Sequence, residues 1–329
     1  MLANSITHLT SGTSTAALDE PRKAFVIAAS EGYLPGLVAT LNGLDYHGNN
    51  MDVYWIYHDE GKGEIAAAEH LMNLIPDAGL CYNTYAVPMS ALMKEWPDGA
   101  ERSRGWKFRF YKYPFMLSLA DRYDVTGALS GDTLVLNHIE PWWDMMANTK
   151  YLLTTNHSFA GRGHILQLTA ENAGSQTCMT DIPLIFDPAK WGDVFHSLWE
   201  RACDTEAAAS ELKALNWAVW HQGRGRDVVY SAECQWVTHH LWYLNIHRVN
   251  VAGKYMFCGD DKIRYWIYTV HGKWAPYSNC KAKASTGNKT LASNVWKLHN
   301  EYRRLITDHK LKPGYEDSSR WAEELRPHG

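Results

Sequence analysis

Short apolar runs alternate with segments of helical spacing in the first third of the chain. The apolar runs at residues 23–30, 52–58 and 80–87 predict buried strands, because a strand covered on both faces is apolar at nearly every position. Between these runs, apolar residues recur three and four positions apart, which is typical of helices. The residues with this spacing are Leu37, Val38, Leu41 and Leu44, and then Ile65, Leu71, Met72 and Ile75. This order predicts an α/β fold with a Rossmann-like, mostly parallel sheet flanked by helices.

The remaining chain continues the alternation and shows no internal repeat or low-complexity linker. Strands are expected at 151–155, 182–186 and 263–270, and helices at 190–203, 206–219, 233–244 and 291–306. The predicted division is a flexible N-terminal tail at 1–22, one domain at 23–275, and a basic helical C-terminal extension at 276–329.

Residues 127–136 join two apolar runs through a small polar corner that holds one carboxylate, Asp132. Such a corner can present a metal ligand at the carboxyl end of a parallel sheet, where open α/β folds bind ligands. The alternative is an Asp in a tight turn between two strands, which needs no ligand. The distant segment 268–274, which contains His271 and Lys273, favours the first interpretation.

Composition and charge add two expectations. Hydrophobic residues make up 46% of the 329 positions, and fifteen tryptophans are more than a core needs, so some should line a groove that stacks on rings or sugars. The formal net charge is −4, but residues 273–312 contain many lysines and arginines and few acids, which predicts a local basic face.

The six cysteines are scattered, with no CxxC pair and no zinc-type spacing. We therefore expect reduced thiols and a cytoplasmic protein. No apolar run approaches the roughly 18 residues of a membrane-spanning helix, and the first twenty residues lack the layout of a signal peptide. No membrane partner is expected.

A nucleotide-sugar donor makes a specific chemical demand on a binding site. Negative charge grows on its diphosphate as the glycosidic bond breaks, so a divalent cation or cationic side chains must face those oxygens. Hard cations take oxygen ligands, and Mn²⁺ also accepts an imidazole. Asp132, His271 and Lys273 together would meet this demand.

Four segments, in matching order, resemble the GT-A-fold glycosyltransferases and in particular glycosyltransferase family eight, the glycogenin-like retaining enzymes. The family's acidic motif and the Thr-Leu-Val-Leu that follows it correspond to Ser130-Gly131-Asp132 and residues 133–136. Its late His-x-x-Gly…Lys-Pro-Trp segment is matched in shortened form by 271–274. An early strand followed by Tyr-x-Pro corresponds to 29–35, and a lysine that opens a helix corresponds to Lys112. These segments span most of residues 23–275.

The resemblance implies a donor site for a nucleoside-diphosphate sugar, with a UDP-sugar as the expected donor. Asp132 and His271 would bind Mn²⁺ or Mg²⁺, and Lys273 would contact the diphosphate. The other implied donor contacts are Tyr33 on the base, and Arg109 and Lys112 at the phosphate or donor sugar. Ser30 and Ser130 are also expected to contact the donor.

One departure from the family affects the metal. Ser130 stands where the family has its first acidic residue, so a usual ligand is missing and a hydroxyl takes its place. Low metal affinity or a less metal-dependent reaction is the expected consequence. The late motif also lacks the proline between Lys273 and Trp274.

The resemblance places the acceptor side in two further segments. Asp181 and Glu233 are candidates to contact the acceptor hydroxyl, and Gln235 is a candidate to touch the donor sugar. The alternatives are a turn-forming role for Asp181 and a first-turn helix position for Glu233, where the helix dipole favours a negative charge.

The leading functional hypothesis is transfer of a sugar, with retention, to a hydroxyl acceptor. The acceptor classes left open are a glycan, a protein, a small molecule, or a hydroxymethylated base in DNA. The DNA option rests on the basic C-terminal region and on the aromatic and basic segment 106–113, since a flipped base needs phosphate contacts and stacking rings. A second hypothesis is a non-catalytic nucleotide-sugar-binding protein. A dinucleotide-dependent oxidoreductase is disfavoured, because no GxGxxG follows the first strand.

Overall fold

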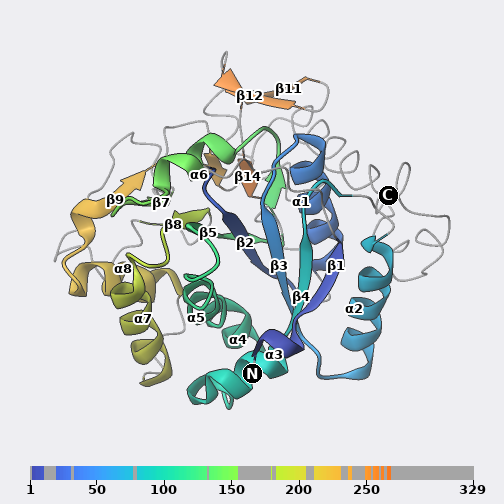
Figure 1. The fold of residues 1–329 in the computed structure, drawn as a ribbon, viewed down its shortest axis with the longest axis vertical. Helices are drawn as coiled ribbons and strands as arrows, with labels where there is room; N and C mark the ends of the chain where they lie inside the picture. Colours follow the sequence, from blue (N-terminus) through green and yellow to red (C-terminus); the bar gives the residue numbers. More distant parts are fainter. Residues whose placement is uncertain are drawn as a thin grey trace, which may run out of the picture.

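The structure is a computed structural model that describes residues 2–10, 20–30, 33–76, 80–131, 133–154, 179, 183–204, 211–230, 236–238, 249–252, 255–258, 261–262 and 265–267. Its main element is an eight-stranded sheet in the order β1-β4-β3-β2-β5-β8-β7-β9. Figure 1 shows these strands in that order, from β9 at the left to β1 at the right. Their bounds are β1 Thr7–Thr10, β2 Lys23–Ala28, β3 Asp52–Tyr57, β4 Thr84–Pro88, β5 Val125–Ser130, β7 Leu152–Thr154, β8 Leu184–Phe186 and β9 Val228–Tyr230.

The four central strands, β4, β3, β2 and β5, run parallel, and β1 and β8 border them as antiparallel neighbours. Beyond β8 the sheet continues through β7, which is antiparallel to β8, to β9, which is parallel to β7. This arrangement confirms the α/β fold with a mostly parallel, Rossmann-like sheet that the sequence predicts.

Side chains alternate between two cores, one on each face of the sheet, because successive residues of a strand point to opposite faces. In β2, Phe25 and Ile27 pack into one core, while Ala24 and Val26 pack into the other. The first core is covered by α1, α2 and α6, and the second by α3, α4, α5, α7 and α8. Figure 1 shows α1 and α2 beside the β4 and β1 end of the sheet, and α7 and α8 beside the β9 end.

The α-helices have the following bounds: α1 Leu34–Tyr46, α2 Lys62–Leu74, α3 Met89–Glu95, α4 Arg104–Phe110, α5 Lys112–Leu117, α6 Glu140–Met146, α7 Gly192–Asp204 and α8 Glu211–His221. Short 3-10 helices lie at Leu2–Ser5, Pro97–Gly99 and Gly225–Asp227. None of the helices in the described ranges is both long enough and apolar enough to cross a membrane.

Two small sheets accompany the large one. The first has the order β10-β14-β6, from Trp236–Thr238, Tyr265–Ile267 and Thr133–Val135. The second has the order β11-β12-β13, from Val249–Ala252, Tyr255–Cys258 and Asp261–Lys262, and β11 and β12 lie at the top of Figure 1. The β10-β14-β6 sheet joins the middle of the chain to a segment about 130 residues later.

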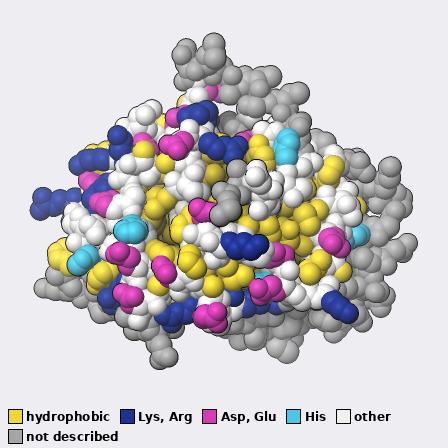
Figure 2. All heavy atoms as spheres, turned by 60° about the horizontal axis from the view of Figure 1, so that its bottom comes forward, with side chains coloured by type: hydrophobic (Ala, Val, Ile, Leu, Met, Phe, Trp, Pro, Cys, Tyr) yellow, Lys and Arg dark blue, Asp and Glu magenta, His cyan; other side chains and the backbone are white. Residues whose placement is uncertain are grey.

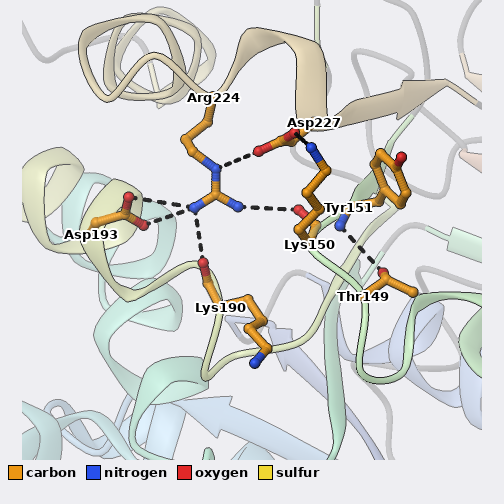
Figure 3. Close-up of polar contacts among 7 residues, drawn as sticks. All are labelled: Thr149, Lys150, Tyr151, Lys190, Asp193, Arg224 and Asp227. Atoms are coloured by element: carbon orange, nitrogen blue, oxygen red, sulfur yellow. Dashed lines mark hydrogen bonds and ion pairs between the residues drawn. The ribbon is translucent and has the colours of Figure 1, made fainter.

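Arg224 forms hydrogen bonds that connect the β7 and β9 end of the sheet to α7 and the residues before it (Figure 3). Its guanidinium donates to a carboxylate oxygen of Asp227 at 2.7 Å and to the carbonyl oxygens of Lys190 at 2.9 Å and Lys150 at 3.1 Å. It also lies 4.2 Å over the Trp191 ring. Lys150 precedes β7 and Asp227 precedes β9, and the ammonium of Lys150 contacts Asp227 at 2.9 Å.

Most predicted elements are confirmed, and two predictions need correction. The helix predicted at 233–244 is wrong at residues 236–238, which form β10; the pairing of β10 with β14 there is non-local. The tail predicted at 1–22 is wrong at Thr7–Thr10, which pair with β4 as an edge strand. The predicted helix at 291–306 and the extension at 276–329 lie outside the described residues.

Candidate active site

Three segments meet where the parallel strands end. β2 runs into Ala29 and Ser30, β5 ends at Ser130 beside Ala28, and α1 begins at Leu34. Two hydrogen bonds hold the turn between β2 and α1: the Tyr33 N–H donates to the carbonyl of Ser30 at 2.8 Å, and the indole N–H of Trp55 in β3 donates to the carbonyl of Ala29 at 3.1 Å. This is the carboxyl edge of the central strands, where open α/β sheets bind ligands.

Gly131 lets the corner after β5 lie directly against the segment that starts α1. A Cβ atom at this position would lie 3.0 Å from the Cβ of Ala29 and 3.1 Å from the Cβ of Tyr33, closer than ordinary van der Waals contact. The absence of a side chain at Gly131 therefore brings this residue next to Tyr33, directly before the first turn of α1. The amino end of α1 lies beside Gly131, and the amino end of a helix favours an anion.

The corner is held by internal hydrogen bonds. The N–H of Ser130 donates to the hydroxyl of Thr133 at 3.2 Å, and the hydroxyl of Thr40 in α1 lies 2.6 Å from the carbonyl of Thr133. Gly43, one turn after Thr40, allows α1 to approach β6, since a Cβ there would lie 2.5 Å from the Val135 carbonyl. A turn this closely packed has a defined geometry, which a site that positions a reacting group requires.

β6 and β14 form one strand pair, and the segments that carry Asp132 and His271 adjoin the same end of this pair in sequence. They are antiparallel, with Thr133 opposite Ile267 and Val135 opposite Tyr265. The chain enters β6 from Asp132 and leaves β14 towards His271, so both segments start at the Thr133 and Ile267 end. Asp132, His271 and Lys273 themselves lie outside the described residues.

Lys112 lies in a buried ion pair that the sequence reasoning missed. Its ammonium is 2.5 Å from Oε1 of Glu211, and the side chains are only 5% and 11% exposed. The hydroxyl of Tyr113 donates to the same Glu211 oxygen at 2.8 Å. Lys112 is the first residue of α5 and Glu211 the first of α8, so the pair joins the beginnings of two helices. A separation of 99 positions gives no local sequence signal for this contact.

The other predicted donor contacts have different surroundings. Ser30 and Tyr33 are half-buried at the corner, and Tyr33 packs partly against the first core. Arg109 is an exposed residue of α4, whereas Lys112 is 4% exposed, so the two cations predicted to share one duty differ strongly in burial. The structure thus brings Ser30, Tyr33 and Ser130 together, and it gives Lys112 a protein partner.

The predicted acceptor contacts Asp181, Glu233 and Gln235 lie outside the described residues. Among the residues that the structure describes, no three His, Cys, Asp or Glu side chains are grouped so as to hold a metal ion. Asp132 and His271, the two predicted metal ligands, lie outside the described residues.

Polar side chains that the sequence reasoning did not single out follow β3 at the same carboxyl edge. His58 is 8% exposed, and Nδ1 of its ring lies 2.9 Å from the carbonyl oxygen of Glu60. The next residue, Asp59, accepts from the backbone N–H of Ser90 at 2.9 Å and from the Ser90 hydroxyl, which joins the segment after β3 to the first turn of α3. Their position directly after a strand is the signal that could have identified them.

A cleft of about 320 Å³ lies at the opposite edge, where the chain enters β2, β3 and β5. Its polar groups bond to one another, since the Tyr123 hydroxyl donates to Asp52 and the Asn83 amide donates to the same carboxylate at 2.8 Å. Burial and the nearby Asp52 charge raise the pKa of Tyr123. Burial also raises the pKa of Tyr54 to about 12, so both phenols stay neutral and stabilise this edge.

Aromatic and basic residues of the segment 106–113 are mostly buried. Trp106, Phe110, Tyr111 and Tyr113 belong to the second core, and Lys107 is 8% exposed. These rings therefore do not form the stacking surface on which the DNA option partly rests. On the face drawn in Figure 2, acidic and basic side chains are interspersed, with hydrophobic side chains between them. Residues 273–312, the predicted basic face, lie outside the described residues.

Glycosyltransferases of known structure that have the GT-A fold share the fold of this chain. One is the galactosyltransferase LgtC, solved in complex with donor and acceptor sugar analogues. It has 15% identity and a TM-score of 0.52, over 92% of this chain and 100% of that chain. Another is the bifunctional glycosyltransferase WbbM in its apo form, with 12% identity and a TM-score of 0.54, over 88% of this chain and 54% of that chain.

No family model matches the sequence, and the comparison with curated proteins gives no match. Identities this low establish the fold alone. The expected GT-A fold is therefore confirmed, as a divergent example whose motifs depart from those of the family that it resembles.

Proposed function

We propose that this protein is a glycosyltransferase that moves a sugar from a nucleoside-diphosphate sugar to a hydroxyl acceptor. The observation that carries the proposal is the pairing of Thr133 with Ile267. Asp132 directly precedes Thr133 in sequence and His271 follows Ile267 by four residues, so this pairing supports a shared site for the two side chains. An acidic residue and an imidazole there suit a donor diphosphate and its cation, either Mn²⁺ or Mg²⁺.

The donor side of the proposal assigns each group a physical task. Tyr33 supports the base, and Ser30 lies beside it at the turn before α1. The amino end of α1 and the ammonium of Lys273 stabilise the negative charge that grows on the leaving diphosphate. Arg109 is exposed and can reach a phosphate. Lys112 can contact a phosphate only if its ammonium binds the phosphate and Glu211 together, or if its ion pair with Glu211 breaks.

The acceptor side is proposed from the resemblance to family eight. Asp181 and Glu233 would contact the acceptor hydroxyl, and Gln235 would contact the transferred sugar. Transfer with retention, a UDP-sugar as donor and a cytoplasmic location belong to the same proposal. A glycan, protein or small-molecule acceptor suits the described residues better than a DNA base, because four of the five rings of the segment 106–113 are buried.

A two-stage experiment tests the proposal. First, melting temperatures are measured with UDP, UDP-glucose, UDP-galactose and other nucleotide sugars, with and without Mn²⁺, since a ligand of the folded state raises the melting temperature. Second, release of the nucleoside diphosphate is measured with the sugar that binds. We expect binding in the first stage and slow donor hydrolysis in the second. Binding without release would support a non-catalytic sugar-nucleotide-binding protein, and no binding of any nucleotide would contradict both functions.

A further inference from the structure

A cleft lies at the edge of the sheet opposite the candidate donor site and has no part in the proposed function. It has a volume of about 320 Å³ and is formed where the chain enters β2, β3, β4 and β5. Pockets for small molecules have volumes of about 300–1,000 Å³, so the cleft suits a ligand of one or two rings. The two sites lie at opposite ends of the same parallel strands, so a ligand of the cleft and the donor can bind at the same time.

The charges in the wall of the cleft compensate one another. Three acidic and three basic residues line it: Glu20, Asp52, Asp121, Arg22, Lys23 and Arg122. The Arg22 guanidinium donates to both carboxylate oxygens of Asp124, at 3.3 and 3.2 Å, and the Lys23 ammonium lies 2.7 Å from a carboxylate oxygen of Asp144. An anion in the cleft would meet carboxylates, and a cation would meet guanidinium groups. The wall therefore favours a neutral ligand.

Hydrogen-bond donors and acceptors both belong to this wall. The Asp52 carboxylate accepts from the Tyr123 hydroxyl and, at 2.8 Å, from the Asn83 amide, and these two bonds use only part of its acceptor capacity. Arg122 is exposed, and a guanidinium has five N–H donors and no acceptor. A hydroxyl group both donates and accepts. Neighbouring hydroxyls of one ligand can therefore satisfy the carboxylate, the amide and the guanidinium together.

The wall is ordered without a ligand. The Tyr123 hydroxyl lies 2.9 Å from the Tyr54 hydroxyl, and the backbone N–H of Val53 donates to the carbonyl of Asn83 at 2.9 Å. The guanidinium of Arg122 lies 6.0 and 5.6 Å from the ring centroids of Tyr54 and Tyr123. Groups that are already held in place lose less conformational entropy when a ligand binds.

We propose that this cleft is a second carbohydrate site, which binds one or two neutral sugar units through Asp52, Asn83 and Arg122. The sugar hydroxyls bond to these three side chains, and Pro21 and Met51 add apolar atoms to the lining for the C–H groups of the ring. The inference goes beyond the proposed function, because this site lies away from the donor edge and takes part in no bond-breaking step. Its task is to hold a glycan on the protein at a distance from the reaction centre.

Saturation-transfer NMR and calorimetry with the full chain test the proposal. The probes are glucose, galactose, N-acetylglucosamine, maltose and lactose, with glucose 1-phosphate and glucosamine as anionic and cationic comparisons, each measured with and without UDP. We expect saturable, millimolar binding of at least one neutral sugar, which is the affinity that so small a ligand allows, and we expect UDP to leave it unchanged. No saturable binding of a neutral sugar, binding of charged probes only, or competition by UDP would each overturn the proposal.

The variant Arg122→Met removes the guanidinium and keeps an apolar stem over the tyrosine rings. We expect it to weaken binding of the neutral sugar by about tenfold or more, because a hydrogen bond from a charged group is lost. The matched control is Arg226→Met, on an exposed arginine that does not line the cleft, and its affinity should equal that of the wild type. Wild-type affinity in Arg122→Met would mean that the sugar binds elsewhere and would contradict the proposal.

Hydrogen exchange of the wild-type chain locates the sugar without any variant, so the proposal stays testable if Arg122→Met does not fold. We expect slower exchange at residues 50–53, 83–84 and 121–125 when the bound sugar is added. Slower exchange confined to other segments would overturn the proposal. The cleft and the donor site also fail separately, since sugar binding here without any nucleotide binding would support the cleft and contradict only the proposed function.

Discussion

Thr133 in β6 lies opposite Ile267 in β14, although the two residues are 134 positions apart. In an antiparallel pair, the chain that enters one strand and the chain that leaves the other are found at the same end. Asp132 directly precedes Thr133, and His271 follows Ile267 by four residues. Four residues span at most about 14 Å, so the imidazole starts from within a short reach of the corner. The hypothesis that these two side chains act together therefore agrees with the register of one strand pair.

A double-mutant cycle on Asp132 and His271 tests this hypothesis. We expect Asp132→Asn and His271→Ala each to lower the rate of donor turnover by about 100-fold or more, as removal of charge-stabilising groups does in other enzymes. Because groups that act as a unit are not additive, the double variant should be little slower than either single variant. Release of nucleoside diphosphate is the measurement, and Asp121→Asn, on an exposed residue at the opposite edge, is the control. Fully multiplied effects in the double variant would mean that the two residues act independently.

Gly131→Ala tests the close packing of the corner against α1. The new methyl group would meet the Cβ atoms of Ala29 and Tyr33 at 3.0 and 3.1 Å, so the corner and Tyr33 must move apart. Overpacking of this kind costs about 1–3 kcal/mol of stability, and the shift should raise the donor KM because Tyr33 is the proposed base contact. The control is Gly105→Ala in α4, where a Cβ meets nothing within 4 Å and stability should not fall. Urea unfolding and donor titrations measure both variants.

The local sequence predicted the central sheet because the pattern of each strand is local. The apolar runs at 23–30 and 52–58 became β2 and β3, and the aromatic residues of the predicted helix at 190–203 lie in the core. The corner between β5 and β6 also followed from its own residues, since a polar turn between two apolar runs needs no distant partner.

Contacts between distant parts of the chain could not be read in the same way. The segment 233–244 is predicted as a helix, yet its residues 236–238 pair with β14, because strand pairing is decided by the partner as well as by propensity. The ion pair of Lys112 and Glu211 joins two helix starts 99 positions apart, and neither charge signals a partner in sequence. Gly43 is a similar case. A side chain there is excluded by the Val135 carbonyl, which lies 92 positions later in the chain.

Replacing both members of the Lys112 and Glu211 pair separates a structural role from a donor-binding role. Glu211→Ala alone leaves a buried ammonium without its carboxylate and should cost about 3–5 kcal/mol of stability. Lys112→Met with Glu211→Leu should restore much of that stability, because apolar side chains of similar volume often replace a buried ion pair at little cost. Chemical denaturation measures the stability, and UDP binding is measured on the double variant. Wild-type affinity for UDP would remove Lys112 from the proposed donor contacts, whereas a loss of tenfold or more would keep it there.

The Asp227 carboxylate gives a pH dependence of stability that can be predicted in sign. Burial alone would raise its pKa, but hydrogen bonds from Lys150 and Arg224 outweigh burial and lower the pKa below its ordinary value of 3.8 (Figure 3). A carboxyl whose pKa is lower in the folded state stabilises the fold above its unfolded pKa, and the contribution is lost as the pH falls through the folded value.

Asp227→Asn should therefore be less stable than the wild type at pH 7, and the difference should shrink as the pH falls below about 4 and approaches the folded pKa. The free energy of unfolding, measured with urea between pH 3 and 7, follows this difference. The matched control is Asp193→Asn, because Asp193 also contacts Arg224, but at 3.3 Å and with a side chain that is 46% exposed. Its loss should change stability less at every pH, since exposed ion pairs contribute little. A difference between Asp227→Asn and the wild type that stays constant from pH 7 to pH 3 would show that the carboxylate acts through packing rather than through its charge.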